Sequence, residues 1–551
     1  MKMTLSDDDL THRSEESDET HLPDDAFFAS ILFEGMTSKD RSRVKQIYVD
    51  EIVTRYEQET SPSKRVTAAQ KAQIKIDIIK KARLYAFDEA QRIKTHQVVR
   101  RKISDNDPTF IVLQIGPEED PLELVNFPTR DWVQFGKDIG KNTHIRDLQV
   151  QLFGEVNAFH VDNEHEEEVE EEEDDVTKED MRQFFQGVSK NRSIEKLSFK
   201  HFHLFSKECF RILGEFFKTN KNLKSLSISY CMLGDTHIDL ATALAGFDSL
   251  TEFELYHRHE NLPWEDMNDE KAAVIIQALS GHSRLRKLSL SGNQIGTGGC
   301  AALATSGLMQ NPNSRLMELD LNDNPINDPE HLDADLGAKF LASMMLGNTS
   351  LTRLNLSCTD IRTNGWIAII AMLRSRNCRL EHLSLSTNQF DDATFKSLSD
   401  VLSNKLTLKT LELRKCNGVS EAGLRAISSI LQNRAMKLVK LDLTGNAQVN
   451  DNVAAAFAKS LTKNTSLKSL ILDDNNITSE GWAAFSQALC NKASYKETYN
   501  SNHTVQEIRF HDELPEDLEM LLECNRKNSV SQAAKKKIVQ NFLRSVKMCG
   551  N

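Results

Sequence analysis

Large apolar residues recur along most of this chain in one fixed frame, L-x-x-L-x-L-x-x-N-x followed by Ile or Phe. Complete copies of the frame begin at Leu285, Leu316, Leu380 and Leu467. The copies that keep the three apolar anchors begin at Ile145, Ile194, Leu223, Leu250, Leu351, Leu408, Leu438 and Val505, with a weaker first copy at Phe110. The starts at 351, 380, 408, 438 and 467 are 29, 28, 30 and 29 residues apart. This period predicts repeating units that each pair one short strand with one helix.

Each part of the frame has a physical role. The L-x-L core predicts a strand whose anchors point inward while the intervening side chains point outward. The asparagine lies where the chain leaves the strand, and we expect its amide to bond backbone groups that the turn leaves unpaired. This position is occupied by Asn293, Asn324, Asn388, Asn446 and Asn475, and by Cys231 and Cys416 in two copies. Helices follow, with Thr363, Ser420 and Thr478 as expected N-caps.

The frame, the period and the Asn-x-Ile followed by Gly resemble the ribonuclease-inhibitor-like class of leucine-rich repeat proteins over about residues 108–515. The resemblance implies an α/β fold, a leucine-rich repeat solenoid (horseshoe) with a parallel β-sheet on the concave face and helices on the convex face. Partners of this class usually dock on the concave strands or on the loops beside them. The class includes enzyme inhibitors, innate-sensor repeats, actin-end cappers and GTPase activators, so the fold alone does not fix the function.

The remaining segments differ in composition from the repeats. Residues 1–60 are predicted to be an acidic, largely disordered segment with room for a short helix. Residues 61–107 predict a basic amphipathic helical segment that caps the N-terminal end of the array. The repeat domain, 108–515, carries an acidic insertion at 162–180 with thirteen acids against Lys178 alone. Residues 516–551 predict a C-terminal helical cap, in which Lys535, Lys536 and Lys537 are expected to form a solvated face.

The outward strand positions form the expected binding surface. Most are small or mixed, but one repeat is stretched to 35 residues and combines charged and aromatic side chains. Aromatic residues and Arg are common binding anchors, and loops on a rigid scaffold often carry function. The residues predicted to bind a partner are Glu252, Glu254, Tyr256, His257, Arg258, Trp264, Glu318, Asp320, Arg353, His382 and Arg414.

Composition and motifs limit the functions that this chain is expected to have. The formal net charge of -13 argues against nucleic acid as the main partner. No motif predicts a catalytic site, a metal site, a cofactor or a small-molecule substrate, and the nine cysteines are interpreted as reduced thiols. Neither a signal-peptide core nor a membrane-spanning stretch is recognised, so a cytoplasmic, or alternatively nuclear, monomer is expected.

The predicted function is a non-catalytic protein-protein interaction scaffold that uses the concave face. Two alternatives remain open. Residues 22–48 resemble the opening of an F-box, which would make the chain a substrate receptor of a ubiquitin ligase. The acidic run combined with this fold resembles the Ran GTPase activators, although in this chain the run lies in the N-terminal part and not in a C-terminal tail.

Overall fold

The computed structural model describes residues 44, 98–115, 129–151, 177–202, 204–257, 267–309, 314–327, 335–511 and 513–543. The chain divides into two compact units. The first is formed by Met1–Asp107 and Ile115–Val125, and the second by Pro108–Gln114 and Asn126–Asn551.

Little of the first unit is described. Val44 is helical and buried, and residues 98–104 are helical. The rest of the predicted F-box-like segment (22–48) lies outside the described residues, and so does most of the predicted basic segment (61–107). Both interpretations therefore stay predictions.

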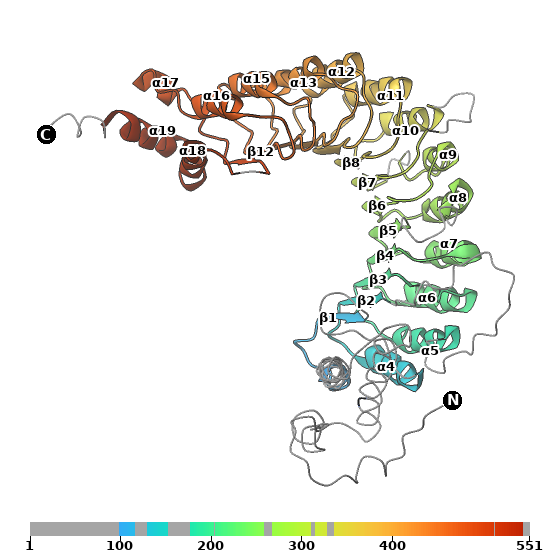
Figure 1. Cartoon of the computed structure of the whole chain (residues 1–551). Coiled ribbons are helices and arrows are strands. Elements are labelled where there is room, and N and C mark those ends of the chain that lie inside the picture. The colour runs from blue at the N-terminus through green and yellow to red at the C-terminus, as the bar shows by residue number, and fades with distance from the viewer. Residues whose placement is uncertain are drawn as a thin grey trace, which may run out of the picture. The chain divides into compact units, whose positions relative to one another are not determined.

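The second unit is built on a 13-stranded sheet in which the strands lie in chain order, and from β2 to β13 every neighbouring pair is parallel (Figure 1). The strands are β1 Val112–Ile115, β2 Asp147–Gln151, β3 Lys196–Lys200, β4 Ser225–Ser229, β5 Glu252–Tyr256, β6 Lys287–Ser289, β7 Glu318–Asp320, β8 Arg353–Asn355, β9 His382–Ser384, β10 Thr410–Glu412, β11 Lys440–Asp442, β12 Ser469–Ile471 and β13 Glu507–Arg509. Parallel neighbours in chain order need a crossover between each pair, and helices supply it.

These crossover helices lie along one side of the sheet (Figure 1). They are α4 Thr129–Lys141, α5 Lys178–Val188, α6 Lys207–Thr219, α7 His237–Ala245, α8 Asp269–Leu279, α9 Thr297–Thr305, α10 Leu336–Leu346, α11 Thr363–Arg374, α12 Asp392–Leu402, α13 Glu421–Arg425, α14 Ser428–Gln432, α15 Asp451–Leu461 and α16 Ser479–Leu489, followed by α17 Tyr495–Tyr499. We call the other side of the sheet the open face. The alternation of strands and helices around a parallel sheet confirms the predicted α/β repeat fold.

The frame leucines form the core because they lie in register from strand to strand. Leu354, Leu383, Leu411, Leu441 and Leu470 are successive partners in the sheet, and all are buried. Buried aromatic residues of the helices, such as Trp366 and Phe395, contribute to the same core. Each repeat buries its apolar face only against its neighbours, as expected for a solenoid.

The predicted asparagine role is confirmed. The Nδ2 atom of Asn388 donates to the carbonyl oxygens of Leu356 at 2.7 Å and Leu385 at 3.1 Å, so the amide bridges two repeats. The same bridging pattern is made by Asn293, Asn324, Asn446 and Asn475.

A second set of asparagines, which we did not predict, lies before the strands. Asn191 Nδ2 donates to the carbonyl oxygens of Ile139 and Asn142, both at 2.7 Å, and its Oδ1 accepts from the amide of Ser193 at 2.7 Å. Corresponding bonds are made by Asn348, Asn464 and Asn502. The signal was present in the sequence, because each of these asparagines precedes the first anchor of its repeat by three residues.

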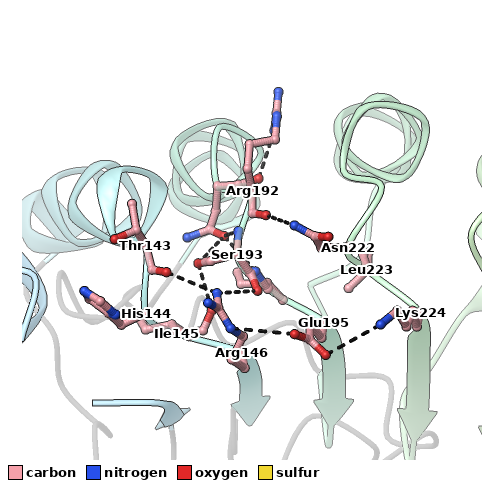
Figure 2. A network of polar contacts seen from close by, with 12 residues as sticks. Thr143, His144, Ile145, Arg146, Arg192, Ser193, Glu195, Asn222, Leu223 and Lys224 are labelled. Atoms are coloured by element: carbon pink, nitrogen blue, oxygen red, sulfur yellow. Dashed lines mark hydrogen bonds and ion pairs between the residues drawn. The ribbon is translucent and has the colours of Figure 1, made fainter. Parts of the chain in front are cut away.

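Charged residues form a row near these asparagines, where the strands begin. Figure 2 shows Glu195 between Arg146 and Lys224, whose nitrogen atoms lie 3.6 and 3.8 Å from its carboxylate oxygens. Asn222 Nδ2 donates to the carbonyl of Arg192 at 2.7 Å in the neighbouring repeat. These exposed contacts tie the early repeats together at their surface.

Two of the three predicted N-caps are confirmed. Ser420 Oγ accepts from the amide of Ala422 at 3.1 Å, and Thr478 Oγ1 accepts from the amide of Glu480 at 3.4 Å. The prediction for Thr363 was wrong, because this residue is the first of α11 and the N-cap is Arg362, which makes no side-chain cap bond. The Thr363 hydroxyl instead donates to Asp391 at 3.0 Å.

A carboxylate from the preceding repeat also caps several helices. Asp451, the first residue of α15, accepts from the amides of Thr478 at 2.8 Å and Gly481 at 3.0 Å, where α16 begins. Asp269 does the same for three amides where α9 begins, and Asp392 accepts from the amide of Ser420. Negative charge is favourable at a helix N-terminus, so each of these aspartates joins two repeats.

The acidic insertion predicted over 162–180 overlaps a helix at its end. Thr177 is the N-cap of α5 and forms a capping box with Asp180. Residues 162–176 lie outside the described residues.

The α-helices α18 Glu516–Lys527 and α19 Val530–Ile538 come last in the described chain, followed by a short π-helix over Val539–Leu543. Leu518 and Leu522 of α18 are buried. The prediction of a fully solvated lysine face on α19 was wrong for Lys537, whose side chain is completely buried and donates to the carbonyl of Leu489 at 2.7 Å.

Candidate functional site

A hollow on the open face, among the described strands, brings several of the predicted side chains together. It lies over β7 to β10 and has a volume of about 200 Å³. Glu318 and Asp320 come from β7, Arg353 from β8 and His382 from β9. The three strands are separated by about one repeat each in the sequence, and the register brings Glu318, Arg353 and His382 side by side. Glu412 of β10 also lines the hollow and was not among the predicted residues.

An ion-pair row crosses this hollow. The Nε atom of Arg353 lies 3.2 Å from one carboxylate oxygen of Glu318, and Lys287 Nζ lies 3.6 Å from the other. The Arg353 side chain is half exposed. A half-exposed guanidinium that is held by one carboxylate keeps donors available for a partner.

Two titratable groups of the hollow are shifted toward their neutral forms. Burial raises the pKa of Asp320, against the opposing effect of the bond that it accepts from the amide of Asn322 at 2.9 Å. Burial, and then the positive charge of Arg353, lowers the pKa of His382. The hollow therefore presents a neutral imidazole beside a paired arginine.

Arg414 lies next to the hollow and does not line it. Its guanidinium contacts the fully buried carboxylate of Asp442 at 2.7 and 2.9 Å. Lys440 Nζ lies 3.1 Å from Glu412 and 3.9 Å from Asp442, so it links this pair to the rim of the hollow. Sequence reasoning selected Arg414 but missed Asp442, whose burial depends on the packing of neighbouring strands.

The predicted group on β5 is separate from this hollow, because β6 lies between β5 and β7. Glu252 is exposed, and Glu254 and Tyr256 are partly exposed. The Tyr256 ring meets Tyr230 edge to face with centroids 4.9 Å apart, and Tyr230 stacks on His201 at 4.8 Å. The three rings form a row across neighbouring repeats.

Three residues of the predicted set do not contribute to the described surface. His257 is buried, with Nδ1 3.1 Å from the carbonyl of Cys231, so its placement on the binding surface was wrong. Strict alternation after Leu255 and Tyr256 would have assigned His257 to the inner side. Arg258 and Trp264 lie outside the described residues.

No three His, Cys, Asp or Glu side chains of the described residues lie close enough together to hold a metal ion. The eight described cysteines are free thiols, and burial raises the pKa of Cys231 and Cys416 to about 12. None of the described helices has the length and apolar character needed to cross a bilayer.

Comparisons with known proteins agree with the repeat fold. A family model described as Leucine Rich repeat matches residues 283–304, 347–369 and 463–486. NACHT, LRR and PYD domains-containing protein 5 of Homo sapiens is 29% identical over 276 residues, which are 50% of this chain and 21% of that protein. Ribonuclease inhibitor of Mus musculus is 26% identical over 262 residues, which are 47% of this chain and 53% of that protein. The chain thus spans less than two thirds of either relative.

Among solved structures, Leiomodin-1 Actin-Binding Site 2 (ABS2) is similar to 33% of this chain and 95% of its own chain, with 15% sequence identity and a TM-score of 0.23.

Proposed function

Because this chain is a leucine-rich repeat protein related to ribonuclease inhibitor and to the repeat regions of the NACHT, LRR and PYD domains-containing proteins, we propose that it is a non-catalytic scaffold that binds protein partners on the open face of its sheet. The hollow over β7 to β10 is the observation that carries this proposal. There, titratable side chains from four successive strands, Glu318, Arg353, His382 and Glu412 among them, surround one depression.

The size of the hollow favours a protein partner over a small molecule. Small-molecule sites usually have volumes of roughly 300–1,000 Å³. The hollow has about 200 Å³ and is lined mostly by polar side chains, so it fits one or two side chains of a partner. Binding energy at protein interfaces is concentrated where a few anchors fill such pockets, and arginines such as Arg353 are frequent anchors.

The proposal can be tested with a photo-crosslinking amino acid placed in the full chain in cells. Thr410 lines the hollow on β10, and Ile367 is exposed on the outer side of α11. We expect the probe at Thr410 to crosslink a specific protein, and the probe at Ile367 not to crosslink it. Arg353→Glu in the Thr410 probe chain should abolish that crosslink.

Circular dichroism should show that the probe chains and the Arg353→Glu variant keep the mixed helix and sheet content. If the same protein were crosslinked from Ile367, or if Arg353→Glu left the crosslink intact, the open-face hollow would not be the binding site.

A further inference from the structure

The loops that connect helices α11, α12, α14 and α15 to the following strands have an excess of positive charge. Residues 375–381, 403–409, 433–439 and 462–468 contain eight basic residues and one acid, Glu381. The basic residues are Arg376, Arg379, Lys405, Lys409, Arg434, Lys437, Lys463 and Lys468. Cations near a helix C-terminus interact favourably with the helix dipole, which explains part of this preference. It does not explain why so many carry no counter-ion.

Most of these cations have no counter-ion among the described residues. Lys409 pairs with Glu381 at 2.7 Å. Of the eight basic residues, it alone forms an ion pair with another described residue. Lys405 donates to the carbonyl of Ser375 at 2.7 Å but meets no carboxylate at ion-pair distance. On the open face, in contrast, Arg353 and Lys440 are held by carboxylates. The loop edge therefore carries positive charge that is largely uncompensated by other described residues.

A hollow of about 630 Å³ lies between the first two of these loops. Arg374, Arg376 and Lys405 line it, and Asp400 is the one acid in its lining. Leu406, also in the lining, is 45% exposed. The hollow shares no residue with the hollow of the open face. It combines three cations with an exposed apolar side chain.

We propose that this basic edge, defined by the four loops and Arg374, binds an acidic segment of a protein partner. The guanidinium groups of Arg374 and Arg376 each present a fork of donors that matches a carboxylate, and Lys405 adds a point charge. Packed helices lie roughly 8–10 Å apart, and an extended chain advances about 3.3 Å per residue. An extended segment laid across the loops thus meets the cations of a new repeat about every third residue.

The overall charge favours an acidic protein segment over a nucleic acid. The chain has a formal net charge of -13, which repels a long polyanion. A short acidic segment needs only the cations within a Debye length of about 8 Å at physiological salt. Leu406 also offers an apolar contact that a peptide side chain can cover.

The test uses a fluorescein-labelled decaglutamate peptide and fluorescence anisotropy in low salt. Both the full chain and a version that lacks residues 162–176 are measured, because the acidic run of the chain itself could compete for the edge. We expect binding that weakens with added salt. An Arg374→Ser/Arg376→Ser double variant should bind the peptide roughly tenfold more weakly. The matched control is Arg211→Ser/Arg425→Ser, which makes the same charge change at exposed helix positions away from the edge and should not change the affinity.

Each other outcome overturns a defined part of the proposal. If neither version of the chain bound the peptide, or if the two double variants bound it with equal affinity, the basic edge would not be a binding site for acidic segments. A ten-nucleotide single strand that bound more tightly than the peptide, with the same dependence on Arg374 and Arg376, would make the edge a nucleic-acid site instead. Thermal melts of both double variants check the fold, and Arg376→Ser alone is the second variant if the double variant unfolds.

Discussion

The Nζ atom of Lys537 on α19 lies 3.3 Å from Nδ1 of His503, and both side chains are buried. Lys537 also donates to the carbonyl oxygens of Leu489 and Asn502, and so joins α19 to the end of α16 and to the chain before β13. Burial, and then the charge of Lys537, lowers the pKa of His503 to about 4. The imidazole is therefore neutral at pH 7, with Nδ1 accepting from the ammonium group.

This pair predicts an acid-sensitive contribution to stability. An unfolded histidine has a pKa of about 6.5. Between pH 6.5 and pH 4 the unfolded chain binds a proton that the folded chain does not, so the free energy of unfolding falls as the pH falls through this window, by on the order of 2 kcal/mol. Urea unfolding at pH 7 and at pH 4.5, followed by circular dichroism, measures the loss. His503→Asn should lose less stability over the same window, and equal losses would rule out a linkage through His503.

The asparagines that bridge neighbouring repeats predict unequal losses of stability when equivalent positions of the frame are replaced. Asn388→Ala removes an amide that donates to Leu356 and Leu385 and accepts from the backbone of Thr359, and unpaired buried groups are costly. We expect a loss of about 2–3 kcal/mol. Asn475 makes the two donor bonds, but its Oδ1 has no hydrogen-bond partner in the described structure, so Asn475→Ala should cost less.

Urea unfolding of the two variants provides the comparison, and Asn377→Ala is the control. Asn377 is exposed, and its Nδ2 makes a single long bond at 3.4 Å. Its replacement should change the free energy of unfolding by less than about 0.5 kcal/mol. An Asn475→Ala variant that lost as much stability as Asn388→Ala would show that the acceptor bond contributes nothing.

The fold could be predicted because its cause is local and repeated. Leu383 occupies the same place in its unit as Leu354 and Leu411 in theirs, so one frame gives the strand, its buried face and its neighbours. The side-by-side arrangement of Glu318 and Arg353 follows from the same register. The frame does not predict which of these positions form a hollow, because that depends on the sizes and pairings of side chains on four strands.

The residues whose environment could not be predicted are those that contact a segment far away in the sequence. The sequence predicts Lys537 to be one of three solvated lysines. In the structure it donates to two carbonyl oxygens of residues far back in the chain. Asp442 is an outward strand position by alternation, yet its side chain is fully buried and lies against Arg414 and Lys440. The capping by Asp451 was missed for the same reason, since it acts on a helix one repeat later.

Arg353 and His382 give a spectroscopic prediction for the open-face hollow. The positive charge of Arg353 contributes to the lowered pKa of His382, after the larger effect of burial. Arg353→Ala should therefore raise the pKa of His382, because the imidazolium loses a repulsive neighbour. A histidine titration followed by NMR measures the change. Arg414→Ala is the control, since Arg414 does not contribute to the shift of His382 and should leave its pKa where it was.

The aromatic row beside β5 predicts a specific glycine requirement. Gly292 has a φ of +65°, and a Cβ atom there would lie 2.3 Å from the Tyr256 ring. Gly307 has a similar φ of +73°, but nothing lies within 4 Å of its Cβ position. Gly307→Ala should thus report the backbone strain alone, about 1 kcal/mol. Gly292→Ala adds displacement of the Tyr256 ring from Tyr230 and should cost about 2–3 kcal/mol in all. Urea unfolding of the two variants measures the difference, and equal costs would mean that Tyr256 moves freely and is not held in the row.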